Sequence, residues 1–147
     1  MATVPFLVRL PRQCLIRTVR DLASFLGVSV LDLRLACNFC FRHLTFIEKV
    51  HFDFAELCLI FKRGRHTGIC FDCIRNVGRE EFLRFFDGTF TATDIEALLG
   101  FAIEHISVRC QLCFRPLTTA EKLAIKAGGD PVYRVRGRFK AKCCLCN

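Results

Sequence analysis

The sequence has 147 residues, a formal net charge of +8 and eleven cysteines. Its first twenty residues hold Pro5, Pro11 and four arginines instead of an uninterrupted apolar run, so we expect neither a secretory signal peptide nor a membrane span. The paired cysteines therefore indicate metal ligands in a reducing compartment rather than disulfides, and the positive charge predicts attraction to polyanions such as nucleic acid.

An N-terminal arm precedes the first predicted helix. Thr18 is suited to cap this helix, an acidic residue follows three positions later, and Gly27 ends it. A second short helix is predicted to begin at Ser29, again with an acidic residue, Asp32, three positions on. Both predictions rest on short-range capping patterns alone.

Four Cys-x-x-Cys pairs follow, and the last two pairs repeat the first two at a constant offset of 73 residues. Within each set, 29 residues separate the inner cysteines. Four thiolates fill a tetrahedral coordination sphere, which is typical of structural zinc, so we expect two bound zinc ions. The eight predicted ligands are Cys37, Cys40, Cys70, Cys73, Cys110, Cys113, Cys143 and Cys146.

The residues between the ligands follow the same offset. Aligning residues 37–73 with 110–146 gives 13 identical positions out of 37, including the run Arg-Gly-Arg at 63–65 and 136–138. This agreement indicates an internal duplication. Because each copy has a full set of four cysteines, we predict two separate metal sites rather than the interleaved ligands of a RING-like ubiquitin ligase module.

Both copies continue with a capping box five residues after their first cysteine pair. Thr45 with Glu48, and Thr118 with Glu121, match the pattern in which each side chain bonds to the other residue's backbone N–H. The second of these helices is predicted over about Thr119–Ala127, because two glycines follow it.

Two stretches after these helices are predicted to be strands. Leu57–Phe61 is continuously apolar, so we expect a buried strand in which Cys58 packs as a small apolar residue. Residues 133–142 alternate apolar with basic side chains, which predicts a strand with one basic face. That face fits either an edge strand protected by its charge or a surface for a polyanion.

The segment between the two copies is predicted to be helical. Residues 77–86 are rich in helix formers and carry three phenylalanines on one side. A further helix is predicted to begin at Thr93, where Glu96 would complete a capping box, and to end at Gly100. Since this connector is too apolar for a flexible linker, we expect it to pack against both copies.

These elements predict an α+β fold of two tandem small zinc-binding domains, each with short helices and a small antiparallel sheet, joined by a connector helix. The predicted boundaries are residues 1–30 for the N-terminal arm and short helix, 31–77 for the first zinc-binding domain, 78–103 for the helical connector and 104–147 for the second zinc-binding domain. Closed four-thiolate sites leave no position for a substrate, and the four histidines lack ligand or triad spacing, so we expect no enzymatic activity.

This organisation resembles the papillomavirus early oncoprotein six over essentially the whole chain. The supporting runs are Phe54-Ala55-Glu56-Leu57-Cys58, Val108-Arg109-Cys110 and Val135-Arg136-Gly137-Arg138. The resemblance implies an adaptor of the host nucleus and host cytoplasm that binds acidic Leu-x-x-Leu-Leu helices. Family partners are a HECT-type ubiquitin ligase, redirected to degrade p53 or the pro-apoptotic Bak protein, and Mastermind-like Notch coactivators.

The resemblance also implies which residues hold the helix. Leu57 would line an apolar pocket, while Arg109 and Arg138 would meet acidic groups, for which the planar guanidinium is well suited. Four further pocket residues match the family in position more than in identity: Phe39, Ile69, Ile74 and Val77.

The chain stops at Asn147, one residue after the last predicted ligand. Many members from high-risk mucosal viruses extend to a terminal motif read by PDZ domains, so we expect no PDZ partner here and a closer likeness to cutaneous-type members. The alternative function is a zinc-dependent, nucleic-acid-binding transcription regulator that uses the basic face at residues 134–142. Phe52 or Phe54, where exposed, would support a weak homodimer.

Overall fold

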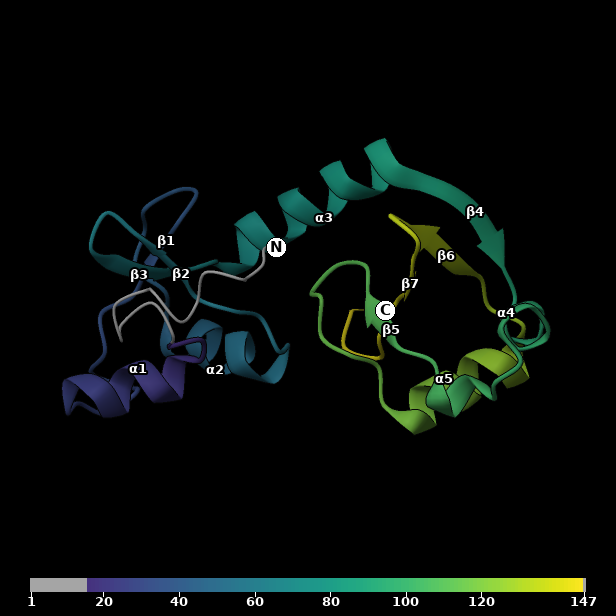
Figure 1. The fold of residues 1–147 in the computed structure, drawn as a ribbon, viewed down its shortest axis with the longest axis horizontal. Coiled ribbons are helices and arrows are strands. Elements are labelled where there is room, and N and C mark those ends of the chain that lie inside the picture. Colours follow the sequence, from purple (N-terminus) through teal and green to yellow (C-terminus); the bar gives the residue numbers. More distant parts are fainter. Residues whose placement is uncertain (1–15, 147) are drawn as a thin grey trace. The chain divides into compact units, whose positions relative to one another are not determined.

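The computed structural model describes residues 16–146 (Figure 1). It contains two compact units, of which the first ends at Cys73 and the second begins at Ile74. The N-terminal arm up to residue 15, which includes Cys14, and Asn147 lie outside the described residues. No helix within the described range is long and apolar enough to cross a membrane.

The first unit packs two helices against a small sheet around one apolar core. Its elements are α1 (Val19–Leu26), β1 (Ala36–Cys37), α2 (Phe46–Phe54), β2 (Ile60–Lys62) and β3 (Arg65–Gly68). The strand order is β1-β3-β2, with β1 parallel and β2 antiparallel to β3. The core contains Val19 and Leu22 from α1, Phe52 from α2, and Leu33 and Leu35 between them in sequence.

The capping signals of this unit are only partly confirmed. α1 has the predicted Thr18 cap, and Gly27 ends it in the left-handed conformation with φ of 71°. The helix predicted at Ser29 is wrong, because the chain forms a single turn there. The carbonyls of Val30 and Leu33 accept hydrogen bonds from Lys49 Nζ at 2.6 and 2.7 Å instead of continuing a helical pattern.

The buried strand predicted over Leu57–Phe61 is wrong in extent and in burial. β2 begins only at Ile60, and although Leu59 is buried, Cys58 and Ile60 are exposed. This alternation is that of a sheet with only one face on the core, where neighbouring side chains point in opposite directions.

The second unit has a larger sheet. Its elements are α3 (Phe71–Phe85), which starts at the last ligand pair of the first unit, β4 (Phe86–Phe90), α4 (Ala92–Leu99), the 3-10 turn η3 (Ile103–His105), β5 (Val108–Cys110), α5 (Thr119–Gly128), β6 (Val132–Val135) and β7 (Arg138–Ala141). The strand order is β4-β6-β7-β5, and β5 is parallel to β7 while the other pairs are antiparallel. Both sheets are therefore mixed rather than antiparallel throughout, which corrects the prediction.

The single strand predicted over residues 133–142 is instead a hairpin. β6 and β7 pair Val135 with Arg138 across a two-residue turn, in which Arg136 and Gly137 have φ of 56° and 73°. Two positive φ angles in succession define the tight turn that suits the twist of two paired strands. Because both strands are inner members of the sheet, the edge-strand interpretation is wrong.

The predicted cap of the second connector helix is also wrong. α4 is capped by Thr91 with Asp94, two residues earlier than predicted, although it ends at Gly100 as expected. Glu96 is used differently, because its carboxylate accepts a hydrogen bond from Ile103 N–H at 2.7 Å.

The structure extends the duplication beyond the cysteine segments. α1 and α4 have bounds that differ by 73 residues at both ends, and so do their caps, Thr18 with Thr91 and Gly27 with Gly100. The helix α4, predicted to belong to the connector, is therefore the second copy of α1. α3 has no counterpart within the described residues.

Candidate metal centres and ligand-binding residues

Each unit brings its four predicted cysteine ligands together in one cluster. In both clusters the four Sγ atoms lie within 4.8 Å of one another. Cys40 Sγ and Cys70 Sγ are 3.7 Å apart, and Cys113 Sγ and Cys143 Sγ are 3.8 Å apart. A tetrahedron with zinc–sulfur bonds of about 2.3 Å has sulfur–sulfur edges of about 3.8 Å. Each cluster thus fits one structural zinc ion, as predicted.

The first cysteine pair of each cluster lies in a tight turn that directs N–H groups at sulfur. Cys37 Sγ accepts a hydrogen bond from Phe39 N–H, and Cys110 Sγ accepts one from Leu112 N–H, both at 3.4 Å. Phe41 and its equivalent in the second unit close these turns with positive φ. Such N–H donors stabilise a thiolate, which is the form that binds metal.

Some of the ligand thiols resist ionisation when no cation is present. The neighbouring Cys113 thiol and burial raise the pKa of Cys110 to about 12, and burial raises the pKa of Cys146 to about 12. Burial also opposes ionisation of Cys37, but backbone N–H donors outweigh it and lower its pKa to about 6. The positive charge of a bound metal ion favours the thiolate form of such cysteines.

A buried glutamate ties the helix of the first unit to its metal loops. Glu48 accepts hydrogen bonds from both Arg42 terminal nitrogens at 2.9 and 2.6 Å, and from Phe71 N–H at 2.8 Å. Phe71 follows the ligand Cys70, so one carboxylate links both cysteine pairs. Burial raises the pKa of Glu48, but Arg42 and the N–H donors outweigh it and lower the pKa to about 2.

The second unit repeats this arrangement, which we call the carboxylate clamp. Glu121 accepts hydrogen bonds from Arg115 at 2.9 and 2.5 Å and from Cys144 N–H at 2.7 Å. Both glutamates also complete the predicted capping boxes. Sequence reasoning identified them as caps only. At the 73-residue offset both the glutamate and its arginine partner are identical in the two copies. This agreement is the sequence signal that indicates the additional role of the glutamates in linking the metal loops.

A lysine on each clamp helix holds the preceding loop. Lys49 is buried and reaches three carbonyls, whereas Lys122 is half-buried and reaches those of Glu104 and Ile106 at 3.4 and 2.7 Å. Burial lowers the pKa of Lys49, but the three carbonyl acceptors satisfy its ammonium group.

Three predicted peptide-binding residues lie in the first unit. Leu57 and Ile69 are partly buried against its core, and Phe39 is 52% exposed. Two more lie on α3, where Ile74 is buried and Val77 is half-buried. Of the two phenylalanines considered for self-association, Phe52 is a core residue and Phe54 is exposed.

The two predicted arginines lie on neighbouring strands of the second unit. Arg109 on β5 is half-buried, and one of its terminal nitrogens donates to Phe114 O at 2.8 Å. Arg138 begins β7 and is exposed, with no ion-pair partner among residues 16–146.

Other cations of the same hairpin are paired. Arg134 bonds to Asp87 at 2.8 Å, while Arg136 and Lys140 both pair with Glu81, at 3.3 and 2.9 Å. The single basic face predicted from the sequence is wrong, because the hairpin pairs Arg134 with Phe139 but Lys140 with Tyr133 and so places these cations on opposite faces. Carboxylates from α3 and β4 also neutralise three of the cations.

The fold and the two clusters define a tandem zinc-binding protein, in which two copies of a four-cysteine α+β unit follow one another. The profile of the Early Protein (E6) family matches residues 37–146. Protein E6 of human papillomavirus type 1 is 39% identical over 131 residues, covering 89% of this chain and 94% of the relative. The chain belongs to the E6 early oncoprotein family.

Another relative and one solved structure are similar to parts of the chain. Protein E6 of human papillomavirus type 8 is 39% identical over 129 residues, covering 88% of this chain and 83% of the relative. The C-terminal zinc-binding domain of the HPV51 oncoprotein E6, solved in solution, is 27% identical, covers 40% of this chain and 78% of that domain, and has a TM-score of 0.38.

Proposed function

We propose that this chain is a non-enzymatic adaptor of the host nucleus and host cytoplasm. It captures acidic Leu-x-x-Leu-Leu helices of a HECT-type ubiquitin ligase, redirected against targets such as Bak, or of a Mastermind-like coactivator. Through these partners it modulates host apoptosis, transcription and innate immunity. The proposal rests on family membership together with two features of the units.

The first supporting feature is the apolar surface near Leu57. Leu57 and Ile69 pack against the first core but keep part of their surface accessible, as residues that receive a leucine side chain must. Burying one leucine contributes roughly 1.5 to 3 kcal/mol before ordering costs. An amphipathic helix with leucines at i, i+3 and i+4 uses this kind of surface.

The second feature, which carries the proposal, is the state of Arg138. Its neighbours Arg134, Arg136 and Lys140 are each paired with a carboxylate of the same unit, so they hold the hairpin in place. Arg138 has no such partner within the described residues and remains available to an acidic peptide. A guanidinium can bind a carboxylate through two parallel hydrogen bonds, which fixes orientation.

The test is a fluorescence polarisation titration of the zinc-loaded full chain with labelled leucine-motif peptides from the ligase and from the coactivator. Arg138→Ala and Leu57→Ala should each weaken binding about tenfold, given the usual contribution of a charge-assisted hydrogen bond or a buried leucine. Arg65→Ala is the matched control, because Arg65 is the exposed equivalent of Arg138 in the first copy, and it should leave binding unchanged.

Absence of saturable binding to both peptides would overturn the proposal. So would equal losses in Arg65→Ala and Arg138→Ala, because they would point to non-specific attraction by positive charge. A weak homodimer through Phe54 stays a prediction.

Nucleic-acid binding is the second candidate, and one observation favours it. The first hairpin carries Lys62, Arg63 and Arg65, all exposed and without an ion-pair partner in the described part of the chain. If phosphate contacts hold DNA there, affinity for a labelled duplex should fall steeply with salt, and Arg63→Ala should reduce that slope. Binding that is absent or independent of salt would eliminate this candidate.

A further inference from the structure

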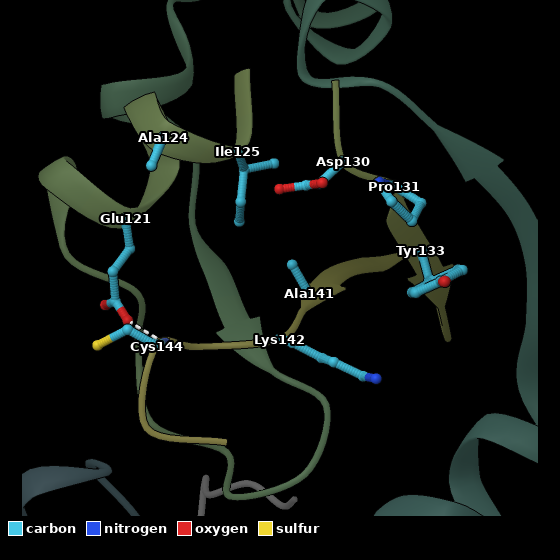
Figure 2. Close-up of a pocket in the computed structure, with 9 residues that line it drawn as sticks. All are labelled: Glu121, Ala124, Ile125, Asp130, Pro131, Tyr133, Ala141, Lys142 and Cys144. Carbon is cyan, nitrogen blue, oxygen red and sulfur yellow. Dashed lines mark hydrogen bonds between the residues drawn. The ribbon is translucent and has the colours of Figure 1, made fainter. Parts of the chain in front are cut away.

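The second unit contains a cleft of about 340 Å³ between the clamp helix α5 and the hairpin strands. Its lining residues are Glu121, Ala124, Ile125, Asp130, Pro131, Tyr133, Ala141, Lys142 and Cys144. Figure 2 shows Ile125 and Ala141 in the middle of the cleft, with the Asp130 carboxylate directed toward Ile125. The volume is within the range of about 300–1,000 Å³ that is common for ligand sites.

The duplication explains why this part of the second unit is hollow. At the 73-residue offset, Ala124 and Cys144 replace His51 and Phe71 of the first unit. There the two rings contact one another edge to face, with centroids 5.2 Å apart. Replacing two rings by a methyl group and a thiol removes the side chains that would fill the space.

At the same sequence offset, two lining residues of this cleft correspond to residues of the first unit that are predicted to bind peptide. Asp130 is the counterpart of Leu57, and Lys142 is the counterpart of Ile69. An apolar pair in the first unit has thus become one acidic and one basic residue in the second. These equivalent positions therefore offer a ligand different chemistry in the two units.

The charged side chains of the cleft differ in whether they already have hydrogen-bond or ion-pair partners. Glu121 is occupied, because Arg115, Cys144 N–H and the helix cap use its oxygens. Asp130 and Lys142 are exposed and have no hydrogen-bond or ion-pair partner for their side-chain charges within residues 16–146. The cleft therefore combines an apolar floor with one unpaired carboxylate and one unpaired ammonium group.

We propose that this cleft is a second peptide-binding site, which takes a short segment with one aliphatic side chain between a basic and an acidic residue. The aliphatic side chain lies against Ile125 and Ala141. The basic residue pairs with Asp130 and the acidic residue with Lys142. This site goes beyond the leucine-motif function, uses other residues and selects a ligand of different charge.

The probe is the capped pentapeptide acetyl-Gly-Arg-Leu-Glu-Gly-amide, titrated into the isotope-labelled, zinc-loaded full chain and followed by amide chemical shifts. We expect saturable shifts confined to the cleft, with a dissociation constant on the order of 1 mM, because only one side chain is buried. The peptide with glycine in place of leucine should not saturate, since ionic contacts alone are weak at an exposed site.

Two variants with matched controls test the two contacts proposed for the peptide, burial of its aliphatic side chain and pairing of its basic residue. Ala124→Leu fills the cleft from an exposed helix position and should weaken binding at least about tenfold, whereas Ala127→Leu on the same helix, outside the lining, should not. Asp130→Asn should weaken binding about threefold, whereas Glu104→Gln, which removes an exposed charge elsewhere in the unit, should have no effect.

Zinc content and the amide spectrum verify that each variant is folded. The proposal is overturned if the peptide causes no saturable shifts, if the shifts lie outside the cleft, or if Ala124→Leu binds as well as the unmodified chain. Because Ala124→Leu should bind leucine-motif peptides normally, failure of this site is distinguishable from failure of the proposed adaptor function.

Discussion

Arg42 and Arg115 occupy equivalent positions in the two carboxylate clamps, but the side chain of Arg42 is 41% exposed and that of Arg115 only 3%. The lysines that hold the preceding loops show the reverse, because Lys49 is buried with three carbonyl partners and Lys122 is half-buried with two. The duplication has therefore kept most of these hydrogen-bond partners, while the burial of each contact decides how much it contributes to stability.

The two hairpins differ in a way that concerns function. Both have an Arg-Gly turn with positive φ at both residues. In the second unit carboxylates neutralise three cations, whereas in the first unit Lys62, Arg63 and Arg65 stay without such partners among the described residues. The metal-binding frame is thus common to both copies, whereas the charge pairing on the hairpins has diverged.

Removal of zinc should have the largest effect on both units. A structural zinc site contributes roughly 10–16 kcal/mol of apparent binding free energy, while a core of this size contributes only about 3–5 kcal/mol. We expect chelation to abolish cooperative thermal unfolding measured by circular dichroism, and added zinc to restore it. A cooperative transition in the metal-free chain would contradict a folding role for the metal.

The two clamp glutamates, Glu48 and Glu121, should contribute unequally to the free energy of unfolding. Glu121→Gln leaves the buried Arg115 without its carboxylate and should lower the free energy of unfolding by about 3–5 kcal/mol. Glu48→Gln should cost about half as much, because water solvates the exposed Arg42. Urea unfolding measures both losses.

Glu80→Gln is the control for the clamp, since the Glu80–Arg84 pair is exposed and should contribute only about 0.3 kcal/mol. Equal losses for the two clamp variants would refute the argument from burial.

The lysines that hold the preceding loops should show the opposite order, with the larger loss of unfolding free energy in the first unit. Lys49→Met leaves buried carbonyls without a donor and should cost about 3 kcal/mol, while Lys122→Met should cost about 1 kcal/mol because water reaches its site. Urea unfolding of both variants gives the comparison. A larger loss for Lys122→Met would reverse the order expected from the structure.

The glycines of the two hairpin turns should also make small contributions to stability. Gly64→Ala and Gly137→Ala should each cost about 1 kcal/mol, because both positions require positive φ. Gly128→Ala is the control, since this helical glycine has no such requirement and alanine favours a helix. Thermal melts should show nearly equal losses at the two turns, and unequal losses would indicate that the hairpins are not equivalent.

The features that sequence predicted correctly depend on short-range or periodic patterns. The eight ligands, the caps at Thr18, Thr45 and Thr118, and the glycine at the end of α4 all follow from local spacing. The cap of α4 was misplaced because Thr91 with Asp94 and Thr93 with Glu96 fit the same pattern. The contact of Glu96 with Ile103 N–H distinguishes them only in three dimensions.

The other errors arise from contacts between distant residues. The turn at Ser29 does not extend into a helix, because the carbonyls that follow it accept hydrogen bonds from Lys49 Nζ instead. Lys49 lies 16 to 19 residues further along the chain. Cys58 is exposed because it precedes β2, and its neighbour Leu59 turns toward the core instead. The cleft beside Asp130 has no local signal at all, since it results from two side chains being smaller than their equivalents 73 residues earlier.

The central claim is that each copy closes its own metal site with its own four cysteines. Native mass spectrometry of the full chain tests it most directly. We predict two zinc ions per chain, and one zinc ion per chain in Cys143→Ser, with the first site retained. One zinc ion in the unmodified chain, or loss of both ions in Cys143→Ser, would contradict two separate sites.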